Sequence, residues 1–102
     1  MSAMRNIMVP KKKIVEFCKK WHILEFSFFG SVLGDSFSAT SDIDVLVRFD
    51  RSAQHGLFEL AAMREELETL FGRSVDLVEM DAVKNPYRRA SILANYEVLY
   101  AA

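Results

Sequence analysis

The stretch Ser41-Asp42-Ile43-Asp44-Val45-Leu46-Val47-Arg48-Phe49 decides the fold, because its alternation has the period of a half-buried β-strand. Successive side chains of a strand point to opposite faces, so one face carries Ile43, Val45, Val47 and Phe49. The opposite face carries Asp42, Asp44, Leu46 and Arg48. We therefore predict a strand over residues 42–49, with an apolar face toward the core and two carboxylates projecting from the other face.

A second strand and a turn are predicted directly upstream. Residues 23–29 are rich in aromatic and aliphatic side chains and are too few for a comfortable helix. Gly30 and Ser31 end this strand, and the segment that follows, up to Thr40, is rich in Gly, Ser and Asp, which is turn chemistry. A glycine–serine turn therefore precedes the strand that carries the two aspartates.

The remaining segments show helical and strand patterns in turn. Apolar side chains at helical spacing predict helices over residues 11–21, 52–71 and 86–93. Ser52 is the predicted N-cap of the second of these, and Gly72 directly follows its end. Strands are predicted over residues 74–80 and 96–100, the latter at a sheet edge. Helices mainly on one face of a small mixed sheet give an α/β (α+β) two-layer fold.

Composition bounds the class of protein. The 102 residues suffice for one domain, which we expect to span residues 1–102. Apolar residues make up 51%, and 13 Lys and Arg nearly balance 14 Asp and Glu, which favours a packed core over disorder or charge-driven nucleic-acid binding. The single Cys18 excludes an intramolecular disulfide, and no apolar stretch approaches the ~20 residues of a membrane span. We expect a soluble, cytoplasmic protein without membrane or nucleic-acid partners.

Asp42 and Asp44 form a candidate metal site. Carboxylates two positions apart on a strand lie roughly 6–7 Å apart and repel each other, so they favour a cation between them. Hard oxygen ligands suit Mg²⁺ or Mn²⁺. A glycine at a strand end lets backbone N–H groups approach an anion, and a serine hydroxyl adds a donor, so Gly30 and Ser31 are candidate phosphate ligands. A phosphate site beside paired carboxylates is what metal-assisted nucleotidyl transfer requires.

Asp76 is the candidate third acid. It lies in an apolar strand between Val75 and Leu77, where an unpaired charge is costly. If this strand pairs beside the strand of Asp42, three carboxylates meet and can hold metal together. Each piece alone has a plainer interpretation, namely a solvated strand surface, a simple turn or a structural acid, whereas their joint order favours catalysis. Arg88 and Arg89 could reach a triphosphate or an acidic partner, but solvent exposure is the favoured interpretation.

These motifs resemble the signature of the DNA-polymerase-beta-like nucleotidyltransferases. The resemblance covers residues 24–100 and is carried by the runs 29–34, 41–47, 72–78 and 96–100. The short length is similar to the minimal nucleotidyltransferase branch, the MntA-like antitoxins of HEPN/MNT toxin–antitoxin pairs. Its glycine–serine and paired-aspartate signature is specific for the superfamily and much less specific for substrate.

The resemblance implies a catalytic and metal-binding triad of Asp42, Asp44 and Asp76, in which Asp76 helps to deprotonate the acceptor hydroxyl. It also implies that Gly30 and Ser31 contact the nucleotide phosphates, and we add Ser41 as a candidate nucleotide ligand. MntA-like members transfer AMP from ATP to a tyrosine of the cognate ribonuclease. Residues 94–96, Ala-Asn-Tyr, stand where an arginine–glutamate pair is expected.

Several functions stay open at this point. The leading hypothesis is a Mg²⁺-dependent (or Mn²⁺-dependent) nucleotidyltransferase that uses ATP and modifies a hydroxyl of a protein partner, a HEPN-type toxin. The second is an antitoxin that neutralises its toxin by covering it, and the third is a nucleotide-binding subunit of a larger assembly. The intact Gly30-Ser31 pair and the three acids favour the enzyme. The acceptor, the preferred nucleotide and self-association stay open.

Overall fold

A four-stranded mixed sheet forms the centre of the protein, in a computed structural model that describes residues 2–3 and 7–102. Its strands are β3 (Ile23–Phe29), β4 (Ile43–Phe49), β5 (Val75–Glu79) and β6 (Tyr96–Ala101), in the order β5-β4-β3-β6. β4 and β5 are parallel, and the other two pairs are antiparallel. The prediction of a mixed sheet with the C-terminal strand at an edge is confirmed. A short antiparallel pair, β1 (Ser2–Ala3) and β2 (Met8–Val9), was not predicted.

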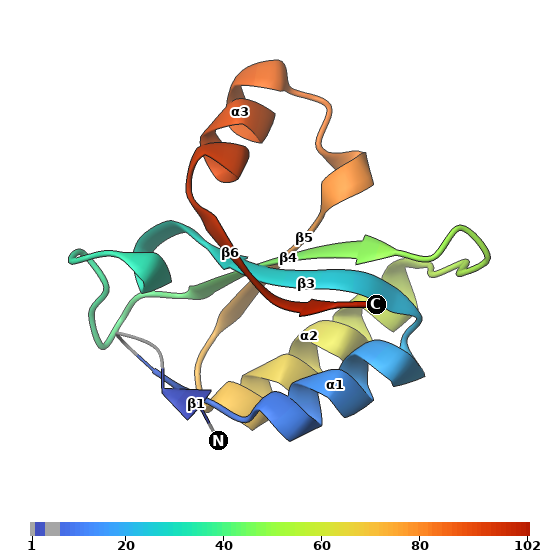
Figure 1. Cartoon of the computed structure of the whole chain (residues 1–102), viewed down its shortest axis with the longest axis horizontal. Coiled ribbons are helices and arrows are strands. Elements are labelled where there is room, and N and C mark those ends of the chain that lie inside the picture. Colours follow the sequence, from blue (N-terminus) through green and yellow to red (C-terminus); the bar gives the residue numbers. More distant parts are fainter. Residues whose placement is uncertain (1, 4–6) are drawn as a thin grey trace.

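Two helices cover one face of the sheet. α1 (Lys11–Lys20) and α2 (Leu57–Phe71) lie side by side below it in Figure 1. The main core lies between them and the strands, and the predicted apolar face of β4 contributes Ile43, Val45 and Val47 to it. The helices contribute Ile14, Phe17, Cys18, Met63 and Leu67. Among the described residues, no helix is long and apolar enough to span a membrane.

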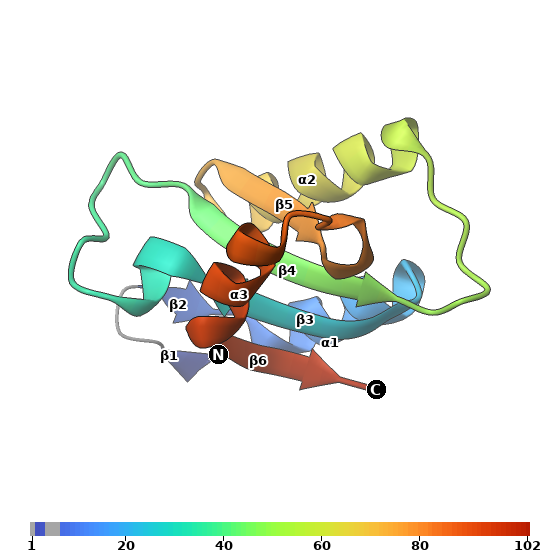
Figure 2. The ribbon, with the colours of Figure 1, turned by 90° about the horizontal axis from the view of Figure 1, so that it is seen from above.

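The third helix, α3 (Pro86–Ala94), lies on the opposite face, above the sheet in Figure 1 and over the strands in Figure 2. A second, smaller core forms beneath it from Phe29, Leu46, Val78, Met80 and Ile92. This packing explains why an apolar Leu46 stands on the same face of β4 as the aspartates. The acid-bearing face is therefore partly covered by α3, and the helix fixes what surrounds the carboxylates.

The start of α2 differs from the prediction. Ser52 is not its N-cap: the backbone N–H and the hydroxyl of Ser52 both donate to Asp50 Oδ1, each at 2.9 Å, and form a local turn. The helix begins only at Leu57, after Gly56, whose N–H donates to Glu59 Oε1 at 2.5 Å. The predicted end is confirmed, because Gly72 adopts the left-handed conformation (φ 67°) and its N–H donates to the Glu68 carbonyl at 2.8 Å.

Candidate active site

The parallel pairing of β4 and β5 brings two of the predicted acids together. Asp44 and Asp76 are direct partners in the register, so their side chains leave the same face of neighbouring strands. Asp42 lies two residues before Asp44, just ahead of the first residue of β4. The condition set by the sequence, that the strand of Asp76 lies beside the strand of the paired aspartates, is met.

The three acids interact electrostatically. The pKa of Asp44 is raised above its ordinary value by partial burial, and then by the charges of Asp76 and Asp42. The neighbours Val75 and Val78 are buried as expected, but Asp76 itself is exposed, so the expected cost of a buried, unpaired charge does not arise. The repulsion among these carboxylates is a local source of instability that a bound cation would relieve.

Gly30 lies next to Asp44 on the β3 side of β4, whereas Asp76 lies on the β5 side. Phe29 pairs with Asp44 at the end of β3, and the chain then turns at Gly30 with a φ of 74° into a short 3₁₀ turn, η1 (Gly30–Leu33). The left-handed conformation is one that glycine adopts without steric cost. Ser31 is half-buried in this turn. The glycine–serine pair thus adjoins Asp44, and its role as a phosphate ligand stays a prediction.

Arg73 contacts and stabilises the loop that precedes Asp42. Its Nη2 donates to the carbonyl oxygens of Ser38 and of Ser41, the latter at 2.9 Å, and its guanidinium lies 4.1 Å from the centre of the Phe37 ring. The Ser41 hydroxyl accepts from the Ser38 N–H at 3.0 Å. The Ser41 side chain is therefore engaged within the loop, and its role toward a nucleotide stays a prediction.

Arg88, for which the sequence favoured simple solvent exposure over a contact with phosphate, lies near the acids. It is exposed, as expected, but it is also the cation near Asp44, whose effect lowers the pKa of that carboxyl and so opposes the carboxylates. Its side chain lines a cavity of about 390 Å³ together with Asp76. The available signal was its spacing, because Arg88 precedes the buried Ile92 by four residues and so shares its helix face.

The acids are suited to a divalent cation that is shared with a nucleotide. In the described ranges 2–3 and 7–102, no three His, Cys, Asp or Glu side chains are gathered into a complete metal site. Mg²⁺ is commonly held by one or two carboxylates together with substrate phosphates rather than by an all-protein cage. Asp42 and Asp44, with their hard oxygen donors and mutual repulsion, fit this mode of binding. The inclusion of Asp76 in the ligand set stays a prediction.

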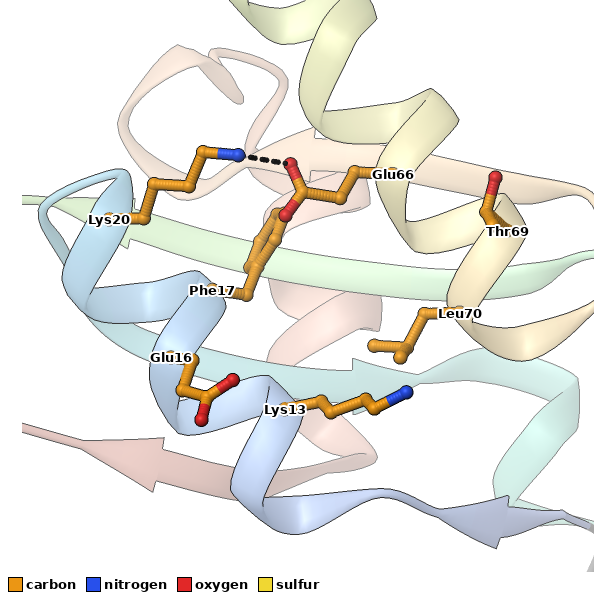
Figure 3. Close-up of a pocket in the computed structure, with 7 residues that line it drawn as sticks. All are labelled: Lys13, Glu16, Phe17, Lys20, Glu66, Thr69 and Leu70. Carbon is orange, nitrogen blue, oxygen red and sulfur yellow. Dashed lines mark hydrogen bonds and ion pairs between the residues drawn. The ribbon is translucent and has the colours of Figure 1, made fainter.

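A larger groove lies elsewhere and carries none of the predicted site residues. Figure 3 shows it between α1 and α2, on the face of the sheet opposite the acids. It measures about 560 Å³, and its lining residues are Lys13, Glu16, Phe17, Lys20, Glu66, Thr69 and Leu70. Lys20 forms an ion pair with Glu66 at 3.1 Å across it. Size alone does not define an active site, and the convergent charges favour the smaller cavity beside Asp76.

Comparison with known proteins defines the class. The nucleotidyltransferase domain family matches residues 11–99, so this chain belongs to that family. Two relatives come from Methanocaldococcus jannaschii and carry the names "Putative protein adenylyltransferase MJ1379" and "Putative protein adenylyltransferase MJ0128". The first is 32% identical over 92 residues and the second 36% over 92 residues. The alignments cover 90% of both chains in the first case and 89% in the second.

Solved structures with the same fold include toxin–antitoxin complexes. One, a toxin–antitoxin with AMP-PNP, superposes with a TM-score of 0.75 at 17% identity and covers 92% of this chain and 75% of that one. Another, a tri-AMPylated HEPN toxin of Shewanella oneidensis in complex with its MNT antitoxin, gives a TM-score of 0.66 at 16% identity, with coverages of 90% and 70%. The protein is a minimal nucleotidyltransferase whose structure is similar to the MntA antitoxin fold.

Proposed function

We propose that this chain transfers AMP from ATP to a hydroxyl group of another protein in the cytoplasm, and that it thereby acts as the antitoxin of a HEPN-type toxin. The observation that carries the proposal is the side-by-side register of Asp44 and Asp76, with Asp42 two residues upstream. A cluster of like charges at the mouth of a cavity is unfavourable unless it serves to bind or to react.

The residues divide the reaction among them. Asp42 and Asp44 would hold Mg²⁺ or Mn²⁺, which would supply positive charge to the phosphates. The Gly30 backbone and the Ser31 hydroxyl bind phosphate oxygens. Asp76 accepts the proton of the acceptor hydroxyl, because its exposed carboxylate opens into the cavity of about 390 Å³. The acceptor oxygen bonds to the α-phosphorus, the bond from this phosphorus to the bridging oxygen breaks, and pyrophosphate leaves.

The known proteins support this substrate class over others. The M. jannaschii relatives carry names of protein adenylyltransferases, and one structural neighbour holds an AMPylated toxin. Another neighbour holds AMP-PNP, an analogue of ATP. These statements concern those proteins, and they favour the same donor and the same class of acceptor for this chain.

The direct test is a mass measurement on the protein encoded by the neighbouring gene. This protein is incubated with the chain, ATP and Mg²⁺, and its intact mass is expected to rise by one or more AMP units. The Asp42→Asn/Asp44→Asn double variant is expected to leave the mass unchanged. ATP labelled at the α-phosphate should label the partner, whereas ATP labelled at the γ-phosphate should not. Label arriving from the γ-phosphate, or an unmodified partner, contradicts the proposal.

Neutralisation by direct binding is a second candidate function. It is favoured by the exposure of large apolar side chains, because Leu57, Phe58 and Tyr87 are 85%, 89% and 86% exposed. If the Asp42→Asn/Asp44→Asn variant neutralises the toxin as well as the wild type in a growth assay, binding and not transfer is the antitoxin mechanism.

A further inference from the structure

α3 is fixed against the sheet in one orientation, and this orientation determines where Arg88 lies. The Asn85 side chain caps the helix by accepting from the backbone N–H groups of Tyr87 and Arg88, at 2.9 and 3.1 Å. Arg89 donates from Nη1 to the Met80 carbonyl at 3.0 Å, and Ile92 is buried in the small core. The helix therefore presents Arg88 to the acid-bearing face, one turn before Ile92.

Arg88 lines two cavities. One, of about 390 Å³, contains Asp76, and the other, of about 340 Å³, contains Gly30. Asp44 adjoins both Gly30 and Asp76, and Arg88 is the cation that acts on its charge. Arg88 takes no part in the ion pairs Lys20–Glu66 and Arg48–Glu25 found among the described residues, so its guanidinium is available.

We propose that Arg88 is the counter-ion of the carboxylate cluster before the nucleotide and its cation bind, and that it binds the nucleotide phosphates once they have entered. This inference rests on the proposed function and names the residue that binds the leaving phosphates. A divalent cation at Asp42 and Asp44 repels the guanidinium from the carboxylates. A triphosphate attracts it, because the planar guanidinium fork matches phosphate oxygens in a bidentate arrangement.

The two roles predict that replacing Arg88 raises the affinity for a divalent cation and lowers the affinity for the nucleotide. Removing the positive charge in Arg88→Gln leaves the acids without their counter-ion, so a divalent cation alone should bind about threefold to tenfold more tightly. The same variant loses a charged hydrogen-bond donor to phosphate, so the nucleotide should bind about 10- to 100-fold more weakly. Arg88→Lys keeps the charge without the fork, and should restore the cation affinity fully but the nucleotide affinity only in part.

Calorimetric titrations test both halves of the proposal. Mn²⁺ alone is titrated into the protein first, and AMP-PNP is titrated in the presence of saturating Mn²⁺ afterwards, with circular dichroism to confirm that each variant is folded. Arg64→Gln is the matched control, because Arg64 is an exposed arginine on α2, across the sheet from the acids. It should change neither affinity.

The outcomes separate this proposal from the proposed function. Tighter Mn²⁺ binding together with weaker AMP-PNP binding in Arg88→Gln supports it. Unchanged AMP-PNP affinity in Arg88→Gln, or a lowered Mn²⁺ affinity, overturns the role of Arg88 alone, provided that the wild type binds the nucleotide. A wild-type protein that binds no AMP-PNP overturns both the role of Arg88 and the proposed function. If Arg88→Gln does not fold, Arg88→Lys decides: full nucleotide affinity without the fork overturns the phosphate role.

Discussion

Gly30 and Asp44 lie so close together that a β-carbon on residue 30 would collide with Oδ2 of Asp44, and would lie 3.3 Å from its Cγ. The contact joins the end of β3 to the start of β4, where Phe29 pairs with Asp44. Two features favour glycine at this position: the nearby carboxylate leaves no room for a β-carbon, and the backbone is left-handed (φ 74°). The Gly30 backbone is thus brought up to a carboxylate that we assign to cation binding.

The first prediction is that Gly30→Ala lowers nucleotide binding out of proportion to its effect on stability. Gly72 is the matched control, because its φ of 67° is equally left-handed but a β-carbon there would meet nothing within 4 Å. Both alanine variants should lose about 1–2 kcal/mol of unfolding free energy from backbone strain, and Gly30→Ala should lose more because of the contact with Asp44. Only Gly30→Ala should lose AMP-PNP affinity, by at least ~10-fold in the presence of Mn²⁺. Equal nucleotide affinities in the two variants would place the phosphate site elsewhere.

The second prediction concerns the dependence of stability on pH. Burial, Asp76 and Asp42 raise the pKa of Asp44, so the folded state binds the proton of this carboxyl more tightly than the unfolded state. The free energy of unfolding therefore falls as the pH rises from the ordinary carboxyl pKa of about 3.9 through the raised pKa. We expect Asp44→Asn without metal to melt at the same or a higher temperature than the wild type at pH 7, and its advantage to shrink toward pH 4.

Asp50 provides a control of opposite sign for this experiment. Hydrogen bonds from the backbone and then the side chain of Ser52 lower the pKa of Asp50, so its contribution to stability is present at neutral pH and is lost as the pH falls. Asp50→Asn should melt at a lower temperature than the wild type at pH 7. Thermal melts in EDTA from pH 4 to pH 8 compare the variants. A destabilised Asp44→Asn at pH 7 would show that the Asp44 carboxylate makes favourable native contacts instead.

The third prediction is that Arg73 positions the loop before Asp42. Arg73→Gln removes the hydrogen bonds to the carbonyls of Ser38 and Ser41 and the contact with Phe37. We expect about 1 kcal/mol lower stability, faster hydrogen exchange in residues 34–42, and an AMP-PNP affinity reduced about 10-fold. Arg64→Gln should change none of these. Faster exchange without loss of affinity would mean that the loop does not set the nucleotide site.

The sequence predicted those features of the fold that depend on local patterns. Strict alternation identified β4 with its apolar face, and Gly72 marked the end of α2, because side-chain period and left-handed backbone are properties of short segments. The predicted start of α2 at Ser52 was wrong, since Ser52 donates hydrogen bonds to Asp50 in a turn that competes with helix capping. Such a competition between two local hydrogen-bonding modes is not decided by residue type alone.

The sequence predicted which acids belong to the candidate site, but not how they are arranged in space. Asp42, Asp44 and Gly30 follow from the pattern around β4, whereas the meeting of Asp44 with Asp76 required the parallel pairing of β4 with β5, which the sequence could state only as a condition. The spacing of Arg88 and Ile92 puts them on one face of α3, but the sequence does not say which face of the sheet this helix covers. The position of Arg88 depends on α3 crossing to the acid-bearing face.

The last prediction separates a catalytic Asp76 from a structural one. Because Asp76 is exposed and adjoins the like charge of Asp44, Asp76→Asn should melt at the same or a slightly higher temperature than the wild type without metal. AMP transfer to the partner should fall by at least ~100-fold, the scale of losing a general base, while AMP-PNP affinity stays within about threefold if Asp76 acts on the acceptor and not on the nucleotide. Glu65→Gln is the control, since Glu65 is an exposed acid on α2, across the sheet from Asp76. A variant of Asp76 that melts earlier and still transfers AMP at the normal rate per folded molecule would reduce the site to Asp42 and Asp44. A large loss of AMP-PNP affinity in Asp76→Asn would instead make Asp76 a third ligand of the nucleotide-bound cation.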